Sequence, residues 1–101
     1  MTKLDELRRY SDPEIVTERY RRYTGNPNAK VYVSDRLDKK YMIFDPITHQ
    51  KIHFGAMGYE DFTKHKDEAR RQRYLNRAMN IHGSWRHDKY SANNLAINLL
   101  W

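Results

Sequence analysis

Residues 51–77 read KIHFGAMGYEDFTKHKDEARRQRYLNR, and this stretch decides the fold. In its first four positions the apolar Ile52 and Phe54 alternate with Lys51 and His53. Alternation with a period of two predicts a strand that buries one face and exposes the other. The glycines that follow allow the strand to end in a turn, because glycine accepts a positive φ angle without steric cost.

The second half of the stretch predicts one long amphipathic helix. It begins at about residue 63 or 66, continues to residue 81 and stops at Gly83. Its apolar side holds Tyr74, Leu75, Ala78 and Met79 at helical spacing. Its other side is strongly cationic and holds Lys66, Arg70, Arg71, Arg73 and Arg77.

Two further strands are predicted before this stretch. Residues 30–34 (KVYVS) and 40–45 (KYMIFD) are rich in β-branched and aromatic residues, which favour strands. Asp45 and Pro46 supply turn chemistry before the strand that begins at Lys51. We therefore expect a meander of two or three short antiparallel strands.

The first 29 residues predict two short helices. The second is better supported, because Asp12 and Pro13 have the order of an N-cap and a first-turn proline, and Gly25 follows as a stop. Its narrow apolar face consists of Val16, Tyr20 and Tyr23. We expect residues 1–29 to form a helical arm.

The last eleven residues, SANNLAINLLW, carry no charge. Leu95, Ile97 and Leu99 alternate with small or amide residues, which is a strand pattern, and Leu100 and Trp101 follow. The segment could form a last strand of the domain's own sheet. It could instead form an arm that docks on a neighbouring protein, by strand addition or by insertion of Trp101 into a pocket.

Composition limits the function classes. The chain of 101 residues carries a net charge of +6, has no cysteine and is 39% apolar, below the about 45–50% of a typical domain. It contains no apolar run long enough for a membrane span or a signal peptide. The basic excess rises along the chain, from +1 in residues 1–29 to +3 in residues 60–90. We expect a protein that needs no disulfide and that favours a polyanion or an acidic protein surface.

The five histidines support neither a metal site nor a catalytic centre. His49 and His53 are four residues apart, but they lie in a predicted turn and strand rather than on one helical face. We therefore expect no cofactor and no enzymatic activity. A small nuclease or other enzyme that uses His65 and Asp67 is a weaker hypothesis.

Nucleic-acid binding has better grounds in two basic segments. Residues 18–23 (ERYRRY) interleave aromatic residues with arginines, and the long helix presents a basic stripe. Clustered cations bind phosphates through counterion release, and aromatic faces stack on bases. The candidate residues for nucleic acid or an acidic partner are Arg19, Arg21, Arg22, Lys64, Lys66, Arg70, Arg71, Arg73 and Arg77.

The same stretch resembles a family of small basic proteins encoded by large nucleocytoplasmic DNA viruses of algae, protists and animals. The motifs within this stretch that match the family are Phe54-Gly55, Gly58-Tyr59, Asp61-Phe62-Thr63, His65-Lys66-Asp67 and residues 73–77. Trp85 and the closing residues 90–101 also match, so the resemblance covers the chain from Lys40 onward. The resemblance implies a viral setting and carries over no catalytic residue.

The chemistry of the motif residues predicts structural roles for them. The glycines permit the turn between strand and helix, and Asp61 and Thr63 can cap the helix that follows. His65 and Asp67 can satisfy backbone groups at its start. The full set of motif residues to which we assign a structural role is Phe54, Gly55, Gly58, Tyr59, Asp61, Thr63, His65, Asp67 and Trp85.

Together these patterns predict an α+β fold: a small antiparallel sheet or hairpin packed with one long basic helix. An N-terminal helical arm (1–29), a domain (30–90) and an apolar C-terminal strand or arm (91–101) follow one another. The leading hypothesis is a minor capsid or cement-type protein in the virion, made in the host cytoplasm, that bridges larger coat proteins in an oligomeric assembly. Its docking residues would be Leu95, Ile97, Leu99, Leu100 and Trp101. The alternative is a nucleic-acid-binding protein for genome packaging or expression.

Overall fold

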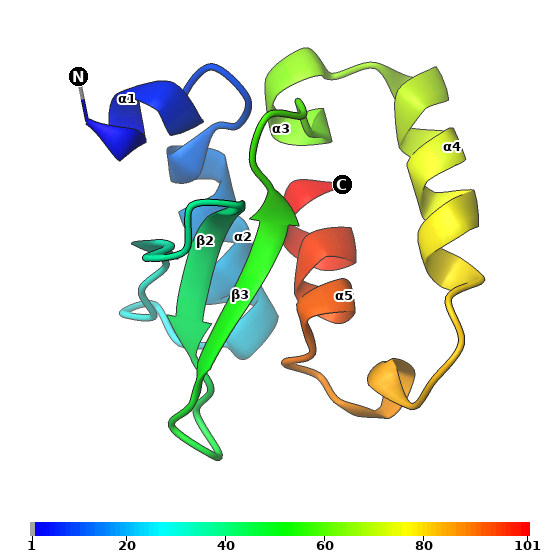
Figure 1. Ribbon diagram of the computed structural model, residues 1–101. Helices are drawn as coiled ribbons and strands as arrows, with labels where there is room; N and C mark the ends of the chain where they lie inside the picture. Colours follow the sequence, from blue (N-terminus) through cyan, green and yellow to red (C-terminus); the bar gives the residue numbers. More distant parts are fainter. Residues whose placement is uncertain (1) are drawn as a thin grey trace.

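A three-stranded antiparallel sheet lies at the centre of the computed structural model, which describes residues 2–101 (Figure 1). Its strands are β1 (Tyr32–Val33), β2 (Lys39–Phe44) and β3 (Lys51–Ala56), in the order β1-β2-β3. Tyr41 faces Phe54 and Ile43 faces Ile52 across the β2–β3 pair. The predicted α+β class and the antiparallel meander are confirmed.

Two helices precede the sheet, as predicted: α1 (Lys3–Leu7) and α2 (Pro13–Thr24). The Asp12 side chain accepts hydrogen bonds from the Glu14 and Ile15 N–H groups, and Gly25 ends α2 in the left-handed region with φ 74°. The prediction of an arm is wrong, because Leu7, Val16 and Tyr20 are buried in the same core as the sheet. These side chains cover one side of the strands, so the N-terminal helices are part of the domain.

The predicted long helix is divided in two, α3 (Phe62–His65) and α4 (Glu68–Met79). Lys66 takes a left-handed conformation with φ 56°, which ends α3, and Asp67 then caps α4 by accepting from the Ala69 and Arg70 N–H groups. Asn80, rather than Gly83, is the C-cap of α4. The prediction that Asp67 lies at the start of a helix is therefore confirmed for α4. Residues 62–65 form a separate short helix.

The C-terminal segment is helical, so the prediction of a strand or arm is wrong. After the short turn η1 (Trp85–His87), α5 (Ala92–Leu95) continues directly into η2 (Ala96–Leu100), whose wider turns close with a hydrogen bond from the Trp101 N–H to the Ala96 carbonyl. The Ser91 side chain caps α5. This C-terminal helix packs beside β3 and against α2 (Figure 1).

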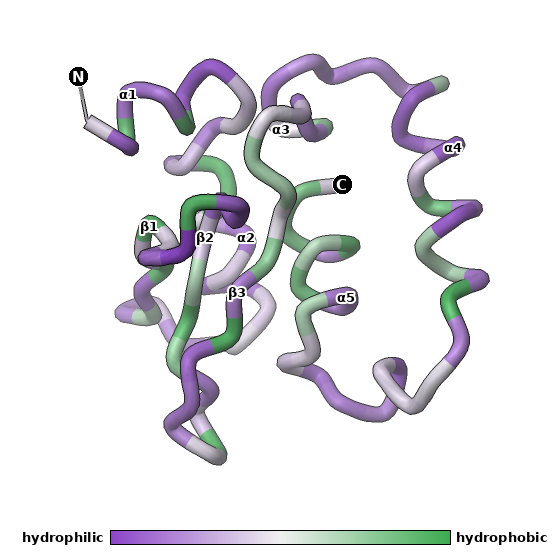
Figure 2. Tube along the Cα trace, viewed as in Figure 1, coloured by the Kyte–Doolittle hydropathy of each residue, from purple (hydrophilic) through white to green (hydrophobic). Residues whose placement is uncertain are grey.

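One apolar core joins the N-terminal helices, the sheet and the C-terminal helix. Leu95, Leu99 and Leu100 are almost fully buried in it, and Figure 2 shows the C-terminal helix as a largely hydrophobic segment. The absence of a side chain at Gly55 lets this helix pack closely on β3. A Cβ atom at this position would lie only 2.9 Å from Leu100 Cδ1. The chain thus covers its own sheet with its own last residues.

Candidate nucleic-acid interface

Helix α4 lies at the edge of the molecule, beyond the C-terminal helix (Figure 1). Only Ala78 of this helix is buried, although its sequence is amphipathic. Arg70, Arg73 and Arg77 are spaced at i, i+3 and i+7, which places them on one side of the helix. We call these three residues the arginine row.

The arginine row is only partly neutralised. Arg70 pairs with Glu60 at 3.4 Å, whereas Arg73 and Arg77 are exposed and have no carboxylate oxygen within 4.0 Å among residues 2–101. Arg71 lies on another side of α4, where it contacts Glu68 at 2.9 Å and donates to the Trp101 carbonyl at 2.8 Å. Two arginine side chains therefore remain available for an anionic partner.

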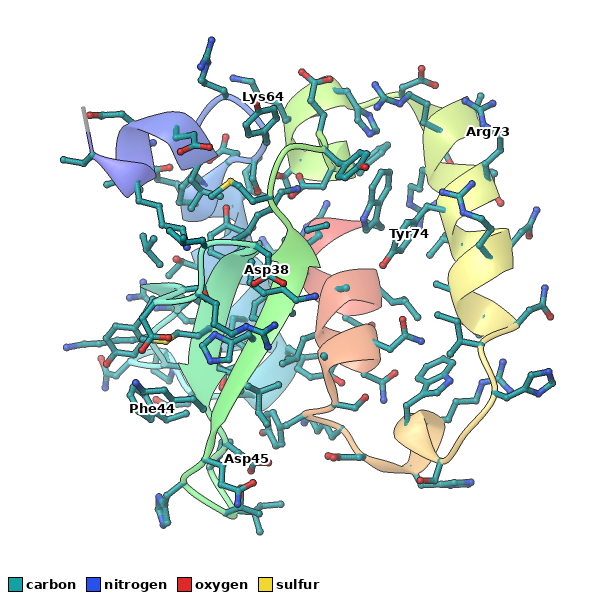
Figure 3. All side chains as sticks on the ribbon, viewed as in Figure 1. Asp38, Phe44, Asp45, Lys64, Arg73 and Tyr74 are labelled. Atoms are coloured by element: carbon teal, nitrogen blue, oxygen red, sulfur yellow. The ribbon has the colours of Figure 1, made fainter. Side chains whose placement is uncertain are left out.

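Trp101 packs against α4 and connects it to the rest of the domain. Its ring stacks on Tyr74 with centroids 4.3 Å apart and an interplanar angle of 9°. A second contact joins the Asn93 side-chain amide to the Ala78 carbonyl at 3.2 Å. Figure 3 shows Tyr74 pointing from α4 toward the C-terminal helix and Arg73 pointing away from it. The aromatic stack thereby holds α4 with the arginine row outward.

The assignment of the C-terminal apolar residues to partner docking is wrong for three of them. Leu95, Leu99 and Leu100 are buried in the core of their own chain. Ile97 and Trp101 are partly buried, and Trp101 packs within the chain on Tyr74 and His65. A residue that fills its own core is unavailable to a neighbour without local unfolding.

The sequence does not predict the turn between α3 and α4, but two of the predicted cap residues do cap these helices. Asp61 caps α3 by accepting from the Thr63 N–H at 3.1 Å, and Asp67 caps α4. His65 Nδ1 accepts from the backbone N–H of Asp67 at 2.9 Å, so these two residues meet through a backbone hydrogen bond. Burial lowers the pKa of His65, which favours the neutral ring.

A buried ion pair behind this turn has no signal in the sequence. Lys40 Nζ lies 3.1 Å from Asp61 Oδ2, and both side chains are inaccessible to solvent. Burial lowers the pKa of Lys40, while the charge of Asp61 opposes that shift. Lys40 sits in a strand where alternation would allow an exposed lysine, so only the tertiary structure reveals its partner.

Thr63 extends the buried contacts to the N-terminal helices. Its hydroxyl contacts Asp61 Oδ1, accepts from the Asp12 N–H at 2.9 Å and lies 3.2 Å from Ser11 Oγ. The Tyr41 hydroxyl in turn donates to Ser11 Oγ at 2.7 Å. This network joins α3, β2 and the α1–α2 connection, and it fixes the position from which α4 departs.

The basic residues of α2 do not join the arginine row. Arg19 donates to the Leu99 carbonyl at 3.3 Å, Arg21 donates to the Ala29 carbonyl at 3.0 Å, and Arg22 pairs with Glu18. These contacts serve the fold of α2 and its neighbours. The structure therefore separates the predicted set of cations into two groups.

The two lysines of the predicted set also differ in their surroundings. Lys64, labelled in Figure 3, lines a shallow depression with Arg8, Asp12 and Glu14 of the N-terminal region. Lys66 is exposed at the junction of α3 and α4, directly before the arginine row. Lys66 is thus the better candidate to extend the row.

Two further motif residues have contrasting surroundings. Trp85 supports the C-terminal connection: its indole N–H donates to the Ile81 carbonyl at 2.8 Å, and its carbonyl accepts from the Asn94 amide at 2.9 Å. Tyr59 is 72% exposed and contributes little to the core, so the structure does not support the structural role that we assigned to it. Its exposed ring instead borders an open pocket of about 450 Å³ between β3, α4 and the C-terminal helix.

Within residues 2–101, no group of three or more His, Cys, Asp or Glu side chains is placed to hold a metal ion. None of the helices in this part of the chain combines the length and the apolar character needed to cross a membrane.

Comparison with known proteins connects the central region to one family. Residues 29–78 match the model of a family described as "Family of unknown function (DUF5754)". The matched region extends from β1 to α4 and contains the Lys40–Asp61 pair and the arginine row. No curated protein and no solved structure matches the chain.

Proposed function

We propose that this protein binds nucleic acid through the phosphate backbone, with the arginine row of α4 as the principal contact. The observation that carries the proposal is the position of Arg73 and Arg77, which are exposed on a helix at the edge of the fold and have no carboxylate partner within residues 2–101. The proposed role is in viral genome packaging or expression, because the sequence resembles viral proteins.

The charges around the row favour a phosphate partner. Guanidinium groups match phosphate oxygens in geometry and remain charged at physiological pH. The whole chain carries a net charge of +6, which adds long-range attraction to a polyanion. Neutralised phosphates release counterions, and this release supplies most of the affinity of such a surface.

A second candidate is a minor capsid or cement-type protein of the virion, present in the host cytoplasm during assembly. The buried ends of the chain do not support it, but two apolar side chains at the end of α4 do: Met79, the last residue of α4, and Ile81, two residues beyond it, are about half exposed. Larger coat proteins would cover these side chains in an oligomeric assembly. Mass spectrometry of purified particles tests this candidate, and absence of the chain at stoichiometric copy number would eliminate it.

The nucleic-acid proposal is tested by charge reversal and fluorescence anisotropy with labelled single-stranded and duplex oligonucleotides. The variant Arg73→Glu/Arg77→Glu should weaken binding by about tenfold or more, because two phosphate contacts become repulsive. Arg9→Glu/Lys30→Glu makes the same change in net charge at exposed positions away from α4 and is the control. Equal losses in both variants would contradict a specific role for the arginine row.

A further inference from the structure

We propose that the open pocket beside α4 accepts one unstacked base of a single-stranded nucleic acid, with Tyr59 as a stacking surface at its mouth. This inference rests on the proposed function and names the class of nucleic acid. It is carried by the shape and the lining of the pocket rather than by charge alone.

The pocket lies where β3, the C-terminal helix and α4 meet. Its volume of about 450 Å³ lies in the range of sites that bind small molecules. Phe54 and Leu100 supply apolar lining, and the stacked pair Tyr74 and Trp101 supplies aromatic lining. An apolar and aromatic interior suits the faces of a nucleobase.

Charged side chains also line this pocket, and the cations among them outnumber the carboxylate. Arg77 lines the pocket and also belongs to the arginine row, and Lys39 lines it from β2. The Glu60 carboxylate also lines the pocket, but it pairs with Arg70. A phosphate held by Arg77 would place the attached nucleotide at the mouth of the pocket. The charge therefore matches a nucleotide better than it matches an uncharged apolar ligand.

Tyr59 is the feature that favours a base over other anionic groups. Its ring is 72% exposed, borders the pocket and follows Gly58, which has φ 96°. Exposed aromatic side chains beside a cationic groove are the usual stacking surfaces for single-stranded nucleic acids. In a duplex the base faces are already stacked on each other, so the pocket selects a single strand.

The experiment uses the full chain with a fluorescein-labelled dT12 oligonucleotide and a duplex of the same length. Tyr59→Ala and Ala56→Trp should each lower the affinity for dT12 by about tenfold, because the first removes a stacking surface and the second fills the pocket. Ala56 is exposed at the end of β3, and this position favours retention of the fold. Tyr59→Phe should bind like the wild type, and the duplex affinity of all variants should stay unchanged.

Two controls separate this inference from the proposed function. Phe44→Ala removes a different exposed aromatic residue, which packs on Tyr32 outside this pocket, and it should leave dT12 binding unchanged. In a Trp85→Phe background Trp101 is the only tryptophan, so quenching of its fluorescence by dT12 reports entry of the base. Loss of binding on Arg73→Glu/Arg77→Glu, with no effect of Tyr59→Ala or Ala56→Trp, would overturn the pocket and leave the proposed function standing. Failure of the wild type to bind either oligonucleotide would overturn both.

Discussion

Lys40 and Asp61 show how single residues position the candidate interface. Their charges are removed from water and stabilise each other at 3.1 Å. Asp61 also caps α3 and receives the Thr63 N–H, so the same carboxylate anchors the helix turn that precedes α4. Removing one charge of such a pair leaves the other charge buried without compensation.

The first prediction concerns this pair. Lys40→Met should lower the free energy of unfolding by about 3–5 kcal/mol, because Asp61 is left charged and unpaired in the interior. Adding Asp61→Asn should recover part of this loss, since the amide oxygen still accepts from the Thr63 N–H. Urea denaturation of the two single variants and the double variant measures the coupling. An unchanged unfolding free energy for Lys40→Met would show that the pair contributes nothing.

His65 provides a pH-dependent test at the same scale. Its folded pKa is lowered, chiefly by burial and then by Arg70, so the unfolded chain binds a proton more readily than the folded chain. The resulting stability is present above the unfolded pKa of about 6.5 and declines as the pH falls below it. Asparagine at this position keeps an acceptor for the Asp67 N–H but does not titrate.

His65→Asn should therefore flatten the loss of stability between about pH 7 and pH 5.5. Thermal unfolding of the wild type and the variant across this interval gives the comparison. Parallel pH profiles for the two proteins would show that His65 has no part in the loss.

At the scale of elements, the C-terminal helix is the segment whose secondary structure the sequence pattern predicted wrongly. Leu95, Ile97 and Leu99 alternate as in a strand, but Leu95, Leu99 and Leu100 also fit one face of a helix. An apolar run this short does not distinguish the two periods. Ser91, which caps the helix, is the signal that could have favoured the correct structure.

The seating of this helix on β3 gives the third prediction. Gly55→Ala should be clearly more destabilising than Gly58→Ala. Both positions have positive φ and share a backbone cost of about 1–3 kcal/mol, but only at Gly55 does a new Cβ meet Leu100 and Lys40. Chemical denaturation of both variants isolates the cost of the contact. If the two losses of stability are equal, the C-terminal helix is not seated as described.

For helices α3 and α4, the sequence predicted the caps but not the break between the two helices. The cap residues and the cationic side were predictable, because aspartates and helical spacing are local signals. The break at Lys66 was not, since a left-handed lysine has no sequence signature of its own. The break matters because it lets α4 begin anew at Asp67 and extend along the edge of the domain.

At the scale of the whole molecule, the low apolar content has a structural explanation. The strands, the N-terminal helices and the C-terminal helix share one core, so few apolar side chains are enough to join them. Local patterns correctly predicted the fold class and most elements. They could not predict which distant segments meet. For this reason residues 1–29 were predicted to form an arm, residues 91–101 a strand or an arm, and the pocket beside Tyr59 was missed.

The same global arrangement sharpens the proposed function. Arg19, Arg21 and Arg22 are engaged within the fold, whereas Arg73 and Arg77 are exposed on α4 without a carboxylate partner in the described chain. Two of the exposed cations are therefore placed together on α4. Their proposed use is to hold phosphates, with the adjoining pocket available to a base.

The most direct test of phosphate binding is the salt dependence of the affinity for a labelled single-stranded oligonucleotide. For the wild type, the logarithm of the binding constant should fall linearly with the logarithm of salt concentration between about 50 and 200 mM. For Arg73→Ala/Arg77→Ala the slope should become less negative by about 1–2, because two phosphate contacts are lost. A wild-type affinity that does not change with salt, or an identical slope in the variant, would contradict phosphate binding by α4.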